Sequence, residues 1–404
     1  MWERFSFYGM RALLVLYLVN HLRFERDDAL QIYALYTGFA YLTPLLGGLV
    51  ADRYLGSRNA VIVGGVLMAI GHFAMAFESL LYLALGLIAF GNGFFKPNIS
   101  AMVGGLYPAG DARRDGAYTI FYMGINLGAL FSPIICGTLG QRLGWHWGFS
   151  AAGVGMLIGL GWFLRRQDTL GDVGRPPRRE RESNDIQADS KLTREEWWQI
   201  WWIGLITLSL LIFIVGFEQA GGTVNLFADE KTDLTFLGFS FPSSWFQSVN
   251  PLIIIFLAPL FDRFWRRFDA NFPGLSKQGW GLLVLGVGFL LMWQAELQAA
   301  DGLVSPLWLL GFYLFATTGE LCISPVGLSM VHKLSPPRLV GLMMAVFLAG
   351  MFAANYLAGT LEATLAFVQT HYGIELNLWV FLAVLEISAG VLFLLYGRHM
   401  GGEK

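Results

Sequence analysis

Charged residues are scarce in this chain. Only 14% of its 404 residues are Asp, Glu, Lys or Arg, whereas 55% are apolar. A soluble chain of this length carries nearer to about a quarter charged residues. The apolar residues gather in runs such as 60–77, 198–217 and 376–396. Runs of this length can cross a hydrocarbon core about 30 Å thick, so the composition argues against a soluble fold.

Cysteine and clustered histidine are also lacking. Cys136 and Cys322 both fall inside apolar runs, which excludes a secreted disulfide framework. The six histidines are scattered and form no HxxH or HExxH pattern, and no Ser/His/Asp grouping occurs inside the runs. These absences argue against a membrane-embedded enzyme. The net charge of −2 gives no reason to expect a nucleic-acid partner. No cleavable secretory signal is evident, because the first apolar run itself begins at the N-terminus.

The runs and their polar breaks predict an all-α integral membrane protein with twelve spans in two bundles of six. The first six spans are expected near 3–22, 30–51, 59–77, 80–103, 116–138 and 145–164. The second six are expected near 197–226, 243–261, 279–297, 305–330, 340–364 and 376–397. The 49 glycines favour close helix contacts, as packing in lipid requires.

Basic residues are distributed very unequally between the two sets of loops. If the loops after the even-numbered spans share a side with the C-terminus, that side holds 20 Lys and Arg residues. The other side holds four: Arg23, Arg26, Arg142 and Lys231. Because cytoplasmic loops carry the excess of positive charge, both termini are predicted to lie in the cytoplasm. The expected location is a bacterial inner membrane, with the lipid bilayer as solvent.

A polar segment divides the chain. Residues 166–196 are mixed in charge and are interrupted by Pro176 and Pro177. This composition predicts a solvated cytoplasmic linker between an N-terminal bundle at 1–165 and a C-terminal bundle at 197–404. Tethering is its expected role. Thirty-one polar residues cannot supply further spans, so twelve are predicted.

Seven of the charged residues inside the predicted spans are singled out: Glu3, Arg4, Arg11, Lys96, Glu218, Glu320 and Glu386. Each costs roughly 2.5–3.5 kcal/mol at mid-membrane unless it pairs or lines a wet cavity. Glu3 and Arg4 lie near a span end, where snorkelling is an alternative. The others are harder to explain without a function, although Glu386 is assigned none.

Corresponding spans of the two halves carry opposite charges. Arg11 in span 1 corresponds to Glu218 in span 7, and Lys96 in span 4 corresponds to Glu320 in span 10. Pairs that bridge the halves could form and break as a carrier rocks. Pro97 follows Lys96 directly and Pro325 follows Glu320, so kinked helices are expected beside these charges.

One face of the first span gathers polar groups. Glu3, Phe7 and Arg11 share a helix stripe, and Arg4 and Tyr8 lie beside it. A guanidinium can hold a carboxylate in a two-bond fork. The stripe therefore predicts an anionic or zwitterionic solute.

Several segments resemble a known family of carriers. Glu3–Arg11 (ERFSFYGMR) is similar to a first-helix motif ExxERFxYYGxR, and Gly48–Arg58 (GLVADRYLGSR) to the loop between helices 2 and 3 of major facilitators. Four further segments match helices 4, 5, 7 and 10: Gly91–Ser100, Phe121–Pro133, Phe217–Asp229 and Gly319–Ser329. Together they resemble the proton-dependent oligopeptide transporter family of the major facilitator superfamily. The resemblance implies a major facilitator fold with two pseudo-symmetric bundles.

The resemblance also implies roles. Arg11 and Lys96 would attract the carboxylate of a di- or tripeptide, and Glu320 with Asn126 and Asn250 would hold its amino terminus. Tyr8, Tyr41 and Ser324 match positions that line the site. Arg11–Glu218 and Lys96–Glu320 would be the outer and inner gate pairs, and Glu3, Arg4 and Glu218 would take part in proton coupling. The implied driving ion is the proton, without a cofactor, and a monomer is expected.

The chain departs from the family pattern at some positions. The first glutamate of ExxER would precede Met1 and is absent here, so an uncoupled peptide carrier is an alternative. Phe7 stands where Tyr is frequent, and Ile214 and Phe347 stand where Trp is common. A carrier of another small anion, such as nitrate or a drug-like anion, is the other alternative. A channel is disfavoured by the paired charges, and His72 is interpreted as a packing residue.

Overall fold

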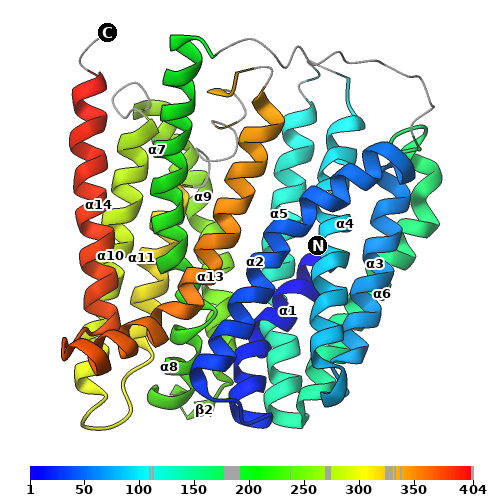
Figure 1. Cartoon of the computed structure of the whole chain (residues 1–404). Coiled ribbons are helices and arrows are strands. Elements are labelled where there is room, and N and C mark those ends of the chain that lie inside the picture. Colours follow the sequence, from blue (N-terminus) through cyan, green and yellow to red (C-terminus); the bar gives the residue numbers. More distant parts are fainter. Residues whose placement is uncertain are drawn as a thin grey trace. The chain divides into compact units, whose positions relative to one another are not determined.

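The computed structural model describes residues 1–108, 111, 113–176, 192–236, 238–268, 274–323, 331, 334–336 and 339–401, and most of them are helical (Figure 1). The long helices of the first half are α1 (Trp2–Leu16), α2 (Arg26–Val50), α3 (Gly56–Ala74), α4 (Leu81–Gly105), α5 (Arg113–Thr138) and α6 (Trp145–Arg166). Those of the second half are α7 (Arg194–Phe217), α9 (Val249–Phe268), α10 (Gly274–Gln298), α11 (Leu307–Ile323), α13 (Val340–Tyr372) and α14 (Leu378–Gly401). Each predicted span therefore contains a helix, although 324–330 lies outside the described residues.

The helices suit a bilayer in length and in surface. Among the described residues, nine helical stretches are long and apolar enough to cross a membrane. One of them, Arg26–Ala74, holds both α2 and α3, while α11 is apolar but shorter. Large apolar side chains such as Ile120, Phe256 and Leu392 are strongly exposed on these helices. Water would penalise so much apolar surface, whereas lipid tails solvate it. The chain is a multi-pass membrane protein.

Contacts between residues divide the chain into two compact units. Unit 1 comprises Met1–Pro177, Gln219–Ile255 and Gly302–Pro306. Unit 2 comprises Arg178–Glu218, Phe256–Asp301 and Leu307–Lys404. Residues 219–255 therefore pack with the helices of the first half, although they follow the linker in sequence. The predicted bundles 1–165 and 197–404 are divisions of the sequence, and they stay a prediction.

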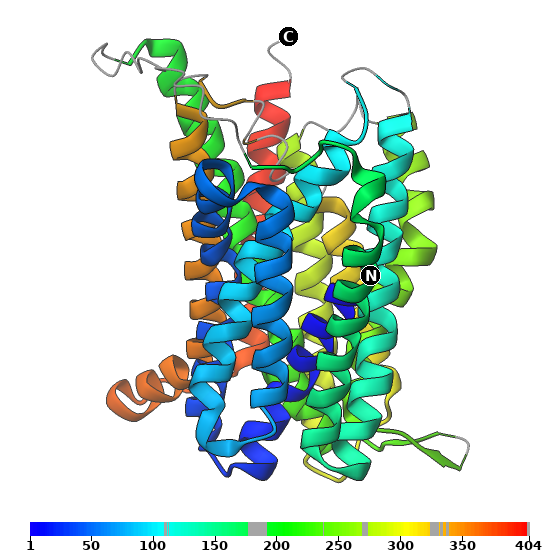
Figure 2. The same ribbon diagram turned by 90° about the vertical axis from the view of Figure 1, so that its right-hand side faces the viewer.

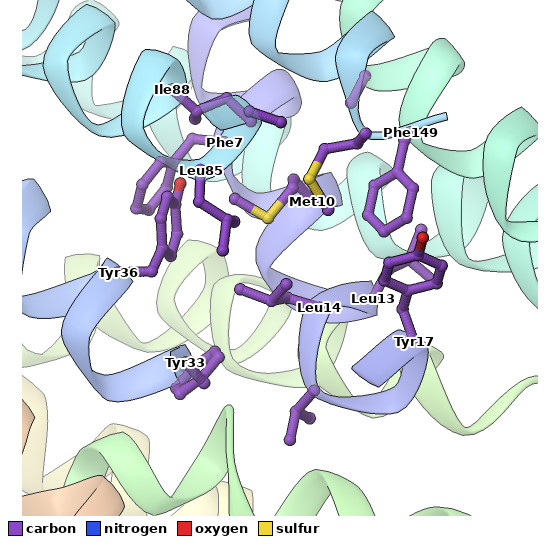
Figure 3. Close-up of a cluster of buried hydrophobic side chains, with 14 of the residues drawn as sticks. Phe7, Met10, Leu13, Leu14, Tyr17, Tyr33, Tyr36, Leu85, Ile88 and Phe149 are labelled. Carbon is purple, nitrogen blue, oxygen red and sulfur yellow. The ribbon is translucent and has the colours of Figure 1, made fainter. Parts of the chain in front are cut away.

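Helix α1 forms the core of unit 1. It packs against α5, α6 and α2, and its residues from Leu13 to Leu16 are completely buried. Figure 3 shows Met10 and Leu13 of α1 lying between Tyr36 of α2 and Phe149 of α6. Tyr17 meets Phe149 edge to face, with ring centroids 5.0 Å apart. This apolar packing fixes the helix that carries the predicted polar stripe.

Equivalent glycine contacts occur in both units. In unit 1, a Cβ on Gly64 of α3 would lie 2.6 Å from the carbonyl oxygen of Gly91 of α4. In unit 2, a Cβ on Gly281 of α10 would lie 2.8 Å from the carbonyl oxygen of Gly319 of α11. The first pair joins spans 3 and 4, and the second joins spans 9 and 10. This repetition is what an internal duplication of six spans predicts.

Helix α7 begins with a cap and ends with a break. Thr193 and Glu196 form a capping box, in which each side chain accepts the backbone N–H of the other. The helix stops at Phe217, and Glu218–Ala220 forms a tighter turn. A short helix, α8 (Thr223–Lys231), then continues, followed by a hairpin of β1 (Thr235–Phe236) and β2 (Phe239–Ser240). The predicted span 197–226 is thus interrupted at Glu218.

Helix α13 is longer than predicted. It extends to Tyr372 rather than ending near residue 364. Figure 2 shows that its last turns, in darker orange, bend away from the direction of the rest of the helix. Phe367 stacks on His371 in this segment, with ring centroids 3.9 Å apart.

The start of the linker is attached to the first turn of α3. The backbone N–H of Arg58 donates to the carbonyl of Gly174 (2.9 Å), and the Arg58 Nε–H donates to that of Val173 (2.6 Å). Gly174 has a φ of +77°, a conformation that favours glycine. The last residue of the GLVADRYLGSR segment therefore holds the chain directly after α6. The predicted linker residues 177–191 lie outside the described residues.

Candidate functional site

Two charged side chains of α1 form a buried pair. Glu3 and Arg4 are each 7% exposed. The Arg4 Nε–H donates to Glu3 Oε2 (2.6 Å), and a terminal Arg4 nitrogen donates to Oε1. This is the two-bond fork that a guanidinium makes with a carboxylate. The pair explains how both charges are tolerated inside a membrane helix.

Aromatic rings surround the cations of α1. The Arg4 guanidinium lies over Phe7 (5.3 Å) and Tyr8 (5.9 Å). Arg11 lies over Tyr8 (6.0 Å), and its Nε–H donates to the Tyr33 hydroxyl of α2 (2.7 Å). Ring faces attract cations, and more strongly where water is excluded. Tyr8 therefore contacts both guanidiniums.

The aromatic lining extends along α2. Figure 3 shows Tyr33 and Tyr36 on the same helix, with Tyr36 beside Phe7. Tyr36 stacks on Phe7 at 6.0 Å, and its buried hydroxyl has no hydrogen-bond partner among the described residues. Arg11 and Tyr33 also closely approach the backbone of Gly221, where a side chain would clash. The stripe of α1 thus faces a tyrosine-rich face of α2.

Lys96 of α4 shares a cavity with the buried pair. Its Nζ lies 4.8 Å from the centre of the Tyr41 ring of α2. A cavity of about 250 Å³ is lined by Glu3 and Arg4 on one side and by Lys96 on another. The structure therefore brings together three of the in-span charges within unit 1. Glu3 and Arg4 are buried and Lys96 is half-buried, and charges inside membrane helices are tolerated where they pair or line a cavity.

Close approach of α2 and α4 places Tyr41 beside Lys96. A Cβ on Gly47 would collide with the Gly93 carbonyl, and Thr43 Oγ1–H donates to the Ala89 carbonyl (2.8 Å). Pro97 lacks the N–H that would otherwise bond to Gly93. Helix α4 continues through this proline to Gly105. The two backbones thus meet one turn from Lys96.

This geometry is found in a chain whose sequence matches a family model. The model described as "POT family" matches residues 58–169 and 182–378, which is well over half of the chain. The chain belongs to the POT family. That result confirms the family suggested by the motif segments.

Several relatives of this POT protein are peptide transporters by name. It is 34% identical to the peptide transporter YePEPT of Yersinia enterocolitica, over 89% of this chain and 84% of that protein. It is 31% identical to a di-/tripeptide transporter of Lactococcus lactis subsp. cremoris, over 98% and 92% of the two chains. It is 35% identical to the uncharacterized transporter YclF of Bacillus subtilis, over 90% and 85%.

Solved POT structures share the fold. A crystal structure of the peptide transporter POT in complex with sulfate matches with a TM-score of 0.89 and 31% identity, over 99% of this chain and 93% of that one. A POT family transporter in complex with a thioalcohol-conjugated peptide matches with a TM-score of 0.87 and 29% identity, over 99% and 94%. These matches confirm the predicted major facilitator architecture.

The remaining predicted site residues of this POT protein are spread over both units. Asn126 of α5 is buried in unit 1 and donates to the Tyr122 carbonyl (3.0 Å), and Asn250 is half-buried in the same unit. Glu218 is buried at the end of α7, and Glu320 is half-buried on α11, both in unit 2. Ser324 lies outside the described residues. The Arg11–Glu218 and Lys96–Glu320 pairs each join different units, and they stay predictions.

A polar cluster in unit 1 was not predicted. Asp229 of α8 accepts hydrogen bonds from Asn20 (2.7 Å), which follows α1, and from Ser243 (2.6 Å). Gln141, which follows α5, donates to Ser243 (2.8 Å) and to Asp229 (3.3 Å). This "Asp229 cluster" joins residues of the two predicted halves. In the sequence, the one indication of this cluster is that Asp229 is the last residue of Phe217–Asp229, the segment that matches helix 7 of the family.

A second unpredicted contact lies beside the buried pair. Ser6 of α1 is 2.5 Å from Nε2 of His72 of α3, and both residues are completely buried. This bond agrees with the interpretation of His72 as a packing residue. Among the described residues there is no group of three or more His, Cys, Asp or Glu side chains that could hold a metal ion.

Proposed function

We propose that the protein is a proton-coupled symporter that imports di- and tripeptides by alternating access. The supporting observation is the cavity that joins Glu3, Arg4 and Lys96 inside a bundle of membrane helices. A carrier of apolar solutes would not need such charges, which are costly to bury. Relatives of high coverage are named di-/tripeptide transporters. We place the protein in a bacterial inner membrane as a monomer with both termini in the cytoplasm.

Binding of the peptide carboxylate is assigned to the cations of unit 1. Lys96 and Arg11 each lie against a tyrosine ring, and a ring face attracts a cation. A guanidinium or an ammonium group binds a carboxylate through charge-assisted hydrogen bonds. Tyr8 and Tyr41 line the approach to these cations. We assign the amino terminus of the peptide to Glu320, Asn126 and Asn250, with Ser324 nearby.

Proton coupling is assigned to carboxylates whose cationic partner can change. Glu3 is held by Arg4 in the structure, and its charge is tolerated because of that pairing. A carboxylate that loses such a partner in a desolvated site favours its neutral, protonated form. Glu218 would undergo the same change if its proposed partner Arg11 turned to the peptide. The gate pairs Arg11–Glu218 and Lys96–Glu320 would then open in alternation.

Uptake into proteoliposomes tests the proposal. With an inward proton gradient, the protein should concentrate labelled dialanine, and a protonophore should abolish that concentration. Lys96→Ala should reduce uptake by about tenfold or more, because a lost ionic contact to a carboxylate is worth about 1.5–3 kcal/mol. Lys277→Ala is the matched control, since Lys277 lies against Trp265 in unit 2 and has no proposed substrate contact. Equal uptake by both variants would refute the role of Lys96.

Competition distinguishes peptides from other anions. Unlabelled dialanine should displace the labelled peptide, whereas free alanine and nitrate should not. Only a peptide offers a carboxylate and an amino group at the required separation. Displacement by nitrate instead would favour the carrier of small anions. Uptake that is saturable but insensitive to the proton gradient would favour the uncoupled carrier.

A further inference from the structure

Glu386 is the most isolated charged group among the described residues. It lies near the middle of α14 and is 0% exposed. Neither of its carboxyl oxygens has a hydrogen-bond partner in the described part of the chain. Buried polar groups are normally paired, and buried charges almost always are. A carboxyl in this position requires an explanation that packing alone does not give.

The carboxyl of Glu386 faces the last turn of α7. A Cβ on Gly216 would lie 2.5 Å from Glu386 Oε1 and 2.9 Å from the Phe289 ring. Leu285 of α10 contacts the same point. Only glycine at position 216 leaves room for the carboxyl. The group is thus enclosed by α7, α10 and its own helix, all within unit 2.

In the part of the chain that the structure describes, no ionisable side chain pairs with this carboxyl. The helices packed against α14 carry ionisable residues at Arg194, Glu195 and Glu196 on α7, at Lys277 and Glu296 on α10, and at Tyr356, Glu362, His371 and Tyr372 on α13. Glu218 directly follows α7, and α14 itself also carries Tyr396, Arg398 and His399. Glu296 binds Asn377, nine residues before Glu386 (2.5 Å). Lys277 lies against Trp265 at 4.8 Å. Because the carboxyl is buried beside Gly216, Phe289 and Leu285 without a described hydrogen-bond partner, its neutral form is favoured over the charged one.

The contact lies next to a point where α7 can change shape. Gly216 is followed by Phe217, the last residue of α7, and then by the turn that starts at Glu218. A helix end has fewer hydrogen bonds to hold it than a helix interior. Glu218 is one of the carboxylates assigned above to proton coupling. A movement of α7 at this break would therefore alter the surroundings of both carboxyls.

We propose that Glu386 is a proton-binding site of the transporter, neutral while Gly216 packs against it and ionised when α7 withdraws. On withdrawal, water enters beside the carboxyl. The O–H bond breaks, its electron pair stays on the carboxylate oxygen, and the proton passes to that water. When α7 returns, the carboxylate regains a proton from water before it is enclosed. The inference rests on the proposed proton-coupled function and adds a second site to it.

The dependence of stability on pH tests the bound proton. Glu386 keeps its proton in the folded state, whereas an exposed carboxyl in the unfolded chain is ionised at neutral pH. The unfolded state then binds fewer protons, so the melting temperature should fall as pH rises from about 6 to about 8. In E386Q the amide imitates the neutral acid without titrating. That variant should show a clearly smaller fall than the wild type over this range.

Transport tests the exchange of the proton. E386Q should retain exchange of labelled dialanine across the membrane without a gradient, because the amide preserves the packing. If one coupled proton is lost, E386Q should concentrate dialanine about tenfold less for each pH unit of the gradient. The reason is that one proton moving down one pH unit supplies about 1.4 kcal/mol, which corresponds to a factor of ten in concentration. Wild-type accumulation by E386Q would overturn the inference, whatever its melting curve. An unchanged pH dependence of melting would overturn it as well.

Two glycine variants provide an independent check. Gly216→Ala should push α7 from the carboxyl and reduce accumulation, whereas Gly204→Ala on the same helix, with open space around it, should not. Equal behaviour of the two would overturn the proposed contact, even if E386Q folds poorly. If the wild type moves no peptide but E386Q still alters the pH dependence of melting, the proton site stands and the proposed substrate fails.

Discussion

Single residues decide how this protein keeps charge inside a membrane. Arg4 is satisfied by a fork to its neighbour Glu3, Arg11 by a tyrosine hydroxyl, and Lys96 lies against a tyrosine ring. These three interactions with a cation differ in strength. A carboxylate fork neutralises a cation, whereas a hydroxyl or a ring only stabilises it. Of these three cations, Arg4 is therefore committed to the carboxylate of Glu3.

Glu3→Gln should destabilise the protein strongly, because it leaves the Arg4 charge buried without its partner. Removing one member of a buried pair costs about 3–5 kcal/mol. The measurement is thermal unfolding in detergent, with Glu25→Gln, an exposed glutamate before α2, as the control. The double variant Glu3→Gln/Arg4→Met should recover much of the loss, since no charge is then left alone. A double variant as unstable as Glu3→Gln would contradict this explanation.

Residue patterns alone singled out the charges of the site but not its uncharged partners. Seven charges inside apolar spans are conspicuous, because each is costly there. Tyr33 and Ser6 are not conspicuous, since tyrosine and serine occur in membrane helices for many reasons. Their importance follows from a hydrogen bond to Arg11 and to His72 respectively. Such bonds depend on which helices are neighbours, and one sequence does not determine that.

At the scale of helices, apolar runs were enough to find nearly every element. The twelve predicted spans and the observed helices differ by a few residues at most ends. The exceptions have physical causes. Helix α7 stops at Phe217 because residues 219–222 turn tightly, with glycines at 221 and 222. Helix α13 continues to Tyr372. Its final turns are helical, but they are not apolar enough to be predicted as part of a membrane span.

The approach of α2 to α4 should be sensitive to a single methyl group. Gly47→Ala places a Cβ against the Gly93 carbonyl and should cost about 1–3 kcal/mol, as overpacking does. It should also reduce dipeptide uptake, because Tyr41 and Lys96 lie on these two helices. Gly48→Ala is a matched control, since no atom lies within 4 Å of a Cβ there. Similar melting temperatures and uptake for both variants would contradict the proposed role of this contact.

At the scale of the whole molecule, the Asp229 cluster joins segments that are distant in sequence. Asn20 and Asp229 are separated by 209 positions. Because Asn20 follows α1 and Asp229 belongs to the second predicted half, the cluster has to open if the halves rock apart on this side. No local pattern could predict it, since its members are ordinary polar residues near helix ends.

Cross-linking tests whether the cluster opens during transport. In Asn20→Cys/Asp229→Cys, mild oxidation should form a disulfide and abolish dipeptide accumulation, and a reductant should restore it. Each single-cysteine variant, treated identically, should keep its activity. The native cysteines are both buried, which limits side reactions. Full uptake by the oxidised double variant, with the cross-link verified by mass, would show that this contact stays closed throughout the cycle.

The composition of unit 1 has a consequence for how the protein is made. Chains are synthesised from the N-terminus, and their parts generally fold in that order. Among the described residues, the side chains of Asn20 and Gln141 find their partners at 229–244, which are translated after the linker and α7. When the ribosome has completed the first six helices, unit 1 is therefore still unfinished. Its assembly in the membrane has to wait for a segment of the second half, so the two halves are not independent during biogenesis.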